Sequence, residues 1–153
     1  MNLIKKRVFF ALALVFVLPL ISTPAYAQNY NYAAHQHLKR SLDFLVNGDY
    51  ANAINSSNNA LRLDPSFTLS YIIRARAYYE INEFDKAITD CSSAIRLDGG
   101  SITAYTIRGN AYKKKGDYTR AITDWETALR VDPNSAEARN NLELAIQHLT
   151  SAE

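Results

Sequence analysis

The sequence predicts an all-α fold, an α-solenoid of three helix-turn-helix units followed by one capping helix. The first observation behind this prediction is a period: residues 34–67, 68–101 and 102–135 align with one another without a gap at a spacing of 34. The second is that apolar residues recur at helical spacing inside each unit, while no stretch shows the alternation that a strand requires. We therefore expect three copies of one helical hairpin in tandem.

The residues that recur are those at which two helices would cross. Small residues occupy the eighth, twentieth and twenty-seventh positions of the three units: Ser41, Ala75 and Gly109; Ala53, Ala87 and Ala121; Ala60, Ala94 and Ala128. The eleventh and seventeenth positions are aromatic throughout, and large rings would fill the space beside such close contacts. This pattern predicts that a first helix packs tightly on a second helix within each unit.

Turn signals separate the predicted helices. Each unit has one near its middle, where the first helix would end: Gly48 and Asp49, Asn82 and Glu83, Gly116 and Asp117. Asp-Pro pairs at residues 64–65 and 132–133, and two glycines at residues 99–100, would end the second helices. Residues 136–150 carry one apolar and one polar face with no second helix to follow, which predicts a capping helix, and residues 151–153 form a tail.

Residues 1–27 have the pattern of a leader for export. A basic stretch at residues 5–7 precedes an apolar run at residues 8–18, and the small-x-small sequence AYA ends at Ala27. The apolar run is shorter than the ~20 residues that a membrane-spanning helix needs. We expect cleavage after Ala27 and a periplasmic or secreted mature chain that begins with a flexible polar segment, residues 28–33. That chain has 14 basic and 15 acidic residues, which argues against a nucleic-acid partner.

The three units resemble the tetratricopeptide repeat family. The third unit carries the family pattern most fully, at Tyr105, Gly109, Tyr112, Ala121, Trp125, Ala128 and Pro133. The second unit departs from that pattern at Cys91 and Gly99, and the first departs at His37 and Ser57. The resemblance implies a right-handed superhelix that acts as a non-enzymatic scaffold or adaptor, with an extended peptide or a partner helix bound on the concave face.

The family's groove positions imply a set of partner-binding residues on the first helices. They are Leu38, Lys39, Leu42, Leu45, Leu69, Ile72, Ile73, Arg76, Tyr79, Thr106, Ile107, Asn110, Lys113 and Lys114. The set is apolar toward the first unit and basic toward the third, and an exposed apolar cluster indicates a contact. Cover of part of this set by the chain's own residues 28–33, or by the terminal cap, is the alternative. The family's clamp for chaperone tails is not expected, because its charged and amide positions are occupied here by Leu38, Leu42, Ile73, Thr103 and Ile107.

No catalytic or cofactor-binding motif occurs in the sequence. His35 and His37 are two residues apart, so on a helix they would not share a face, and we expect no metal site. The single cysteine, Cys91, allows no intramolecular disulfide and is interpreted as a small buried residue.

Charged residues recur at two further positions. Arginine occupies the seventh position of each unit (Arg40, Arg74 and Arg108), and aspartate occupies the twenty-third position of the second and third units (Asp90 and Asp124). We interpret these residues as structural ion pairs, Arg74 with Asp90 and Arg108 with Asp124, rather than as catalytic acids. The first unit has Ser56 at the aspartate position, so Arg40 should lack such a partner.

The sequence thus predicts a protein-binding scaffold with no enzymatic activity, cofactor, metal or nucleic-acid partner. Two alternatives stay open: a self-associating structural component that dimerises through the groove or an open repeat end, and an accessory subunit of an envelope enzyme or export complex. The basic run KKK at residues 113–115 would end a first helix, where cations offset the helix dipole. We expect Lys113 and Lys114 to meet an acidic side chain of the partner, and Lys115 to contact solvent alone.

Overall fold

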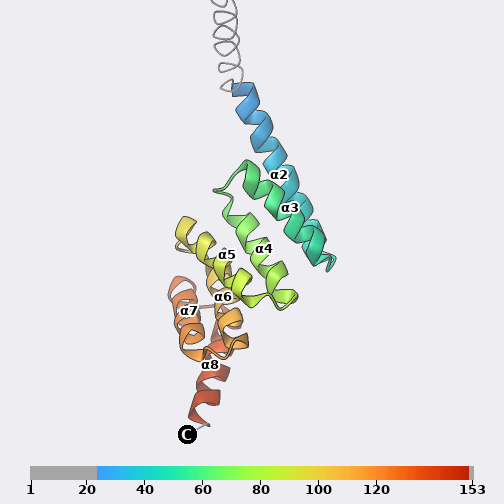
Figure 1. Cartoon of the computed structure of the whole chain (residues 1–153). Coiled ribbons are helices and arrows are strands. Elements are labelled where there is room, and N and C mark those ends of the chain that lie inside the picture. Colours follow the sequence, from blue (N-terminus) through green and yellow to red (C-terminus); the bar gives the residue numbers. More distant parts are fainter. Residues whose placement is uncertain (1–23, 152–153) are drawn as a thin grey trace, which may run out of the picture.

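The computed structural model describes residues 24–151, which form seven α-helices and no strand (Figure 1). The helices are α2 (Pro24–Val46), α3 (Tyr50–Leu63), α4 (Thr68–Glu80), α5 (Phe84–Leu97), α6 (Ile102–Lys114), α7 (Tyr118–Val131) and α8 (Ala136–Thr150). None of these helices is both long enough and apolar enough to cross a membrane. The predicted all-α fold is confirmed.

The helices form an elongated stack of hairpins that runs from α2 at one end to α8 at the other (Figure 1). Helix α2 packs on α3, α4 on α5, and α6 on α7, and each second helix also packs on the first helix of the next hairpin. The first helices contact one another in succession, α2 with α4, α4 with α6, and α6 with α8. The first helices therefore form one continuous side of the solenoid.

The first helix is longer than the repeat predicts. Helix α2 has 23 residues, whereas α4 and α6 have 13 each. Residues 28–33, which we expected to form a flexible segment, continue α2 without a break. Adding residues to an existing helix costs little once the first turn has formed, which accounts for the extension although asparagine and tyrosine are weak helix formers. Of the predicted leader, residues 24–27 begin α2, and residues 1–23 lie outside the described residues.

The three turns inside the hairpins share one geometry. Gly48, Asn82 and Gly116 have positive φ angles of 75°, 61° and 80°. The backbone N–H of the next residue in each turn donates to a carbonyl five residues back, over 2.9 Å in all three units. This arrangement ends a helix through a residue in the left-handed region, which glycine and asparagine tolerate. The turn signals in the sequence are thus explained by backbone conformation.

In the second and third units, the size of the eighth residue is matched to that of the twenty-fourth residue. In the third unit Gly109 lies against the fully buried indole of Trp125, and a Cβ atom on Gly109 would come within 2.7 Å of the indole Nε1. In the second unit Ala75 lies in the same buried cluster as the smaller Cys91. A large ring on one helix therefore requires a glycine on the other.

The contact between the first two hairpins contains polar atoms. Ser57 on α3 and Ser70 on α4 are both fully buried. Neither hydroxyl has a hydrogen-bond partner in the part of the chain that the structure describes. The equivalent positions in the next contact hold Cys91 and Ala104, which join an apolar cluster. Because a buried hydroxyl without a partner costs free energy, these two serines make the first inter-hairpin contact less favourable than an apolar one would be.

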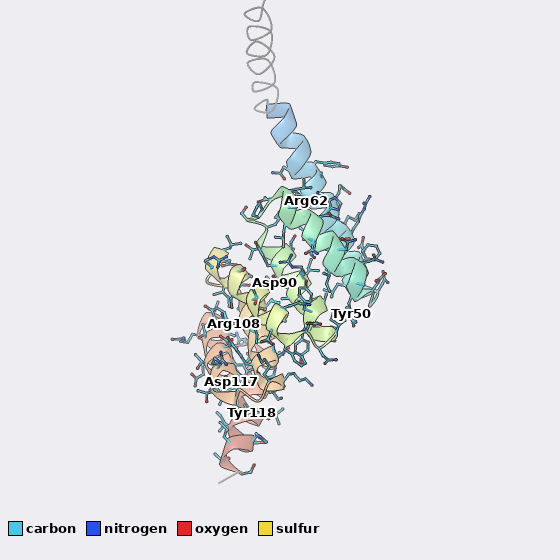
Figure 2. The ribbon with its side chains drawn as sticks, in the orientation of Figure 1. Tyr50, Arg62, Asp90, Arg108, Asp117 and Tyr118 are labelled. Atoms are coloured by element: carbon cyan, nitrogen blue, oxygen red, sulfur yellow. The ribbon has the colours of Figure 1, made fainter. Side chains whose placement is uncertain are left out.

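Arginine–aspartate pairs join the helices within the second and third hairpins. Arg74 Nε and Nη2 donate to the two carboxylate oxygens of Asp90 over 2.7 and 2.6 Å. Arg108 makes the same pair of bonds to Asp124, over 2.9 and 2.7 Å. Figure 2 labels one member of each pair, Asp90 and Arg108, in successive hairpins. Both aspartates are 4% exposed. These are the ion pairs that the sequence predicts, and each joins the two helices of one hairpin.

Each of these arginines also reaches the preceding hairpin. Arg74 Nη1 donates to Asn58 Oδ1 on α3 over 2.5 Å, and Arg108 Nη1 donates to Ser92 Oγ on α5 over 3.0 Å. One guanidinium thus connects three helices, and the hydrogen bond to its aspartate raises the pKa of each arginine. Arg40 is exposed, as expected from the serine at the aspartate position of its unit.

We expect Gly109→Ala to destabilise the protein by about 1–2 kcal/mol, because overpacking against a fixed ring outweighs the better helix propensity of alanine. The free energy of unfolding from urea titration, followed by circular dichroism, measures this change. In a Trp125→Phe background the indole is gone, so the cost of the same substitution should shrink. An equal cost in both backgrounds would show that the indole is not the obstacle.

We expect Asp124→Ala to destabilise the protein by about 3 kcal/mol, because it leaves the largely buried Arg108 without a counter-charge. The matched control is Arg40→Ala, which removes an exposed arginine at the equivalent position and should cost less than about 0.5 kcal/mol. Urea titration measures both variants. The double variant Arg108→Met with Asp124→Leu should recover most of the loss, and its failure to do so would contradict the assignment of the cost to an unpaired charge.

Candidate functional site

Two hollows lie along the side of the solenoid that the first helices form. The first hollow, about 420 Å³ in volume, is lined by Leu45, Tyr50, Arg76 and Glu80. The second, about 400 Å³, is lined by Tyr79, Asn110, Lys113, Lys114, Tyr118, Glu137 and Asn141. Three of the four residues that line the first hollow have counterparts one repeat further along in the second: Leu45 matches Tyr79, Arg76 matches Asn110, and Glu80 matches Lys114. The two hollows are thus successive sites of one groove, and Figure 2 labels Tyr50 and Tyr118, one from each.

The structure brings six of the predicted groove residues into these hollows. Leu45 and Arg76 line the first, while Tyr79, Asn110, Lys113 and Lys114 line the second. Five other predicted residues lie on first helices outside the hollows: Leu38, Lys39, Leu42, Leu69 and Ile72. Among these, Leu42 and Leu69 are 45% and 48% exposed. A partner that lies along the first helices can therefore contact apolar side chains as well as the hollows.

Three of the predicted groove residues are buried in the protein instead. Ile73, Thr106 and Ile107 are only 3%, 5% and 3% exposed, so the expectation that they contact a partner is wrong. Ile107 belongs to the core cluster that also contains Cys91. The physical reason is that adjacent first helices pack directly on one another, and these side chains fill the contact between them. The open apolar surface is consequently smaller than the sequence suggests.

Five lining residues are absent from the predicted set: Tyr50, Glu80, Tyr118, Glu137 and Asn141. The two tyrosines occupy the seventeenth position, which the sequence pattern indicates as core. Glu137 and Asn141 belong to α8, and they occupy the second and sixth positions if the repeat register is continued into the cap. Extending the register past the third unit would have identified them.

Asn110 forms the centre of a polar network in the second hollow. Its side-chain oxygen accepts hydrogen bonds from Trp125 Nε1 over 3.2 Å and from Asn141 Nδ2 over 3.0 Å. Its amide nitrogen donates to Glu137 Oε1 over 3.2 Å. The network joins α6, α7 and α8 and gives the buried indole N–H its partner. The base of the second hollow is therefore held in one arrangement.

The two hollows differ in charge. In the first, Arg76 Nε pairs with Glu80 Oε1 over 2.8 Å, so the charges cancel. In the second, Lys113 and Lys114 are both present at the lining. Lys115 forms an ion pair with Asp85 of α5. Our expectation that Lys115 contacts solvent alone is wrong, because this exposed side chain extends to the preceding hairpin.

The remaining chemically reactive side chains do not converge on a site. Cys91 is fully buried, and burial raises the pKa of its thiol, with a smaller contribution from Asp90. A thiol in this state is a poor nucleophile. His148 stacks on the Tyr118 ring at 4.5 Å, while His35 packs edge-on against Phe67 at the other end of the stack. Residues 24–151 contain no group of three or more His, Cys, Asp or Glu that could hold a metal ion.

Comparison with known proteins identifies relatives of the same architecture. Two family models match, described as tetratricopeptide repeat over residues 38–102 and as TPR repeat over residues 109–149. The second TPR of Spaghetti (RPAP3), bound to HSP90 peptide SRMEEVD, is 31% identical, with a TM-score of 0.67, over 71% of this chain and 99% of that one. The second TPR domain of human RPAP3, in complex with HSP70 peptide SGPTIEEVD, is 28% identical, with a TM-score of 0.70, over 78% and 97%.

A third solved structure, the Arabidopsis OM64 TPR domain, is 24% identical, with a TM-score of 0.77, over 78% of this chain and 98% of that one, and shows the fold alone. Comparison with curated protein sequences gives no match. A stack of paired helices with a hollowed face along the first helix of each pair defines a helical-repeat protein. The chain belongs to the tetratricopeptide repeat family.

Proposed function

We propose that the protein is a non-enzymatic scaffold that binds a peptide or a partner helix along the face of its first helices. The observation that carries this proposal is the pair of hollows spaced one repeat apart on that face. Solenoids offer such a continuous surface to extended partners. Leu42 and Leu69, both exposed on first helices, add apolar contact area.

The solved relatives support peptide binding, but the residues of this chain favour a different ligand. The RPAP3 domains are bound to peptides that end in EEVD. The positions that would hold such a tail carry Leu38, Leu42, Ile73, Thr103 and Ile107 in this chain. These side chains offer no positive charge to a carboxylate, and both isoleucines are buried. A chaperone tail is therefore not the ligand we propose.

Leu42→Asp and Leu69→Asp should each weaken capture of a partner from envelope extract by at least about tenfold, because a charge on an apolar contact must be desolvated. Leu97→Asp is the matched control, since Leu97 is 44% exposed on α5, away from the groove. Circular dichroism checks that all three variants fold. Ile73→Asp is unsuitable, because it would place a charge in the core.

Unchanged capture by both groove variants would overturn the groove proposal. If no partner is captured and the molar mass in light scattering rises with concentration, self-association is favoured instead. The end of the stack gives that second candidate a physical basis, because Leu144, Ile146 and Leu149 of α8 are 55%, 46% and 42% exposed.

We also propose that the scaffold acts outside the cytoplasm, on the basis of the leader pattern in residues 1–27. The mass of the protein recovered from the periplasm of a bacterial host should correspond to a chain that begins at Gln28. Replacing both Ala25 and Ala27 with leucine should block processing, whereas Ala33→Leu should not. Recovery of the full-length chain from the cytoplasm would contradict export.

A further inference from the structure

The lining of the two hollows has a small excess of positive charge. Three basic residues line them, Arg76, Lys113 and Lys114, against two acidic residues, Glu80 and Glu137. Residues 28–153 as a whole have 14 basic and 15 acidic residues. The lining of the hollows thus carries a net charge of opposite sign to that of residues 28–153.

Lys113 and Lys114 are the basic residues of the second hollow, and neither forms an ion pair within the described residues. The ion pairs of the described residues engage Arg76 with Glu80 and Lys115 with Asp85, and none includes Lys113 or Lys114. Glu137 also lines this hollow, but its carboxylate accepts a hydrogen bond from Asn110. The hollow thus has one more positive than negative charge.

Lys113 is half-buried beside the aromatic walls of the second hollow, and Lys114 is exposed at its edge. The rings of Tyr79 and Tyr118 stand beside them, and burial raises the pKa of Tyr79, so its hydroxyl stays protonated and can donate a hydrogen bond. Partial exclusion of water strengthens the attraction between an ammonium and a carboxylate. The chemistry of this hollow fits an acidic side chain.

The first hollow fits an apolar side chain. Its lining includes Leu45 and the ring of Tyr50, and the pairing of Arg76 with Glu80 leaves it without net charge. Packed helices lie about 10 Å apart, so two sites one repeat apart are separated by a similar distance. An extended chain advances about 3.3 Å per residue and covers that distance in about three residues.

We propose that the groove binds an acidic peptide segment in which an apolar residue and an aspartate or glutamate are about three residues apart. The apolar side chain occupies the first hollow, and the carboxylate contacts Lys113 and Lys114 in the second. This inference rests on the proposed scaffold function and adds the chemistry of the ligand to it.

The test uses the purified protein and fluorescent ten-residue peptides with blocked ends, in which two leucines are followed after three residues by two glutamates. The same peptide in reverse order allows for either chain direction. The control peptide has glutamine in place of both glutamates. We expect the glutamate peptide, in whichever direction binds more tightly, to bind at least about fivefold more tightly than this control, as two screened ion pairs allow. The difference in affinity should shrink as the salt concentration is raised.

The variant Lys113→Gln with Lys114→Gln should abolish the preference for glutamate over glutamine. Lys115→Gln is the matched control, because Lys115 carries the same charge at the same helix end but pairs with Asp85. The melting temperatures of both variants show how much stability is lost with the favourable positive charge at the end of α6. A weaker preference for glutamate without a lower melting temperature indicates loss of the ligand contact.

Equal binding of the glutamate and glutamine peptides, with both weakened by Leu42→Asp, would overturn the acidic preference while leaving the scaffold function intact. Binding of none of the peptides would overturn the acidic-segment proposal, whereas the scaffold function is tested separately by capture of a partner with the groove variants. A ten-nucleotide single-stranded DNA supplies negative charge without apolar side chains, and binding as tight as that of the glutamate peptide would also overturn the proposal.

Discussion

The contact between a first-helix arginine and a second-helix aspartate constrains both the hairpin and the stack. The two carboxylate bonds fix the separation of Arg74 and Asp90, and the remaining guanidinium nitrogen bonds the preceding hairpin through Asn58. Because the fork of a guanidinium is planar and rigid, the positions of its three partners are set together. The angle between successive hairpins, and so the path of the groove, depends on this one side chain in the second and third units.

The sequence predicts the parts of the structure that repeat within it. The turn glycines, the small crossing residues and the Arg108–Asp124 pair all recur at a fixed spacing, and each expresses a contact inside one hairpin. Their positions could therefore be inferred without coordinates. The match between Gly109 and Trp125 belongs to the same class, since the family pattern places both in the third unit.

Contacts between hairpins were harder to predict. The burial of Ile73 and Ile107 depends on how closely neighbouring first helices approach, which no spacing in the sequence specifies. The ion pair of Lys115 with Asp85 joins residues 30 apart across two hairpins and has no counterpart in the other units. The Asn110 network depends on where the cap lies. The chemistry of the groove is thus decided by the inter-hairpin geometry that sequence patterns describe least well.

The two buried serine hydroxyls of α3 and α4 favour opening of the stack between the first and second hairpins. In a solenoid each unit is held mainly by its neighbours, so local unfolding begins at a contact that is weakened. Ser57 and Ser70 weaken the contact between the first hairpin and the rest, so α2 with α3 would separate as one cooperative unit. The first hollow spans this boundary, whereas the second lies beyond it. A bound segment that occupies both hollows would therefore hold the first hairpin closed and slow hydrogen exchange within it.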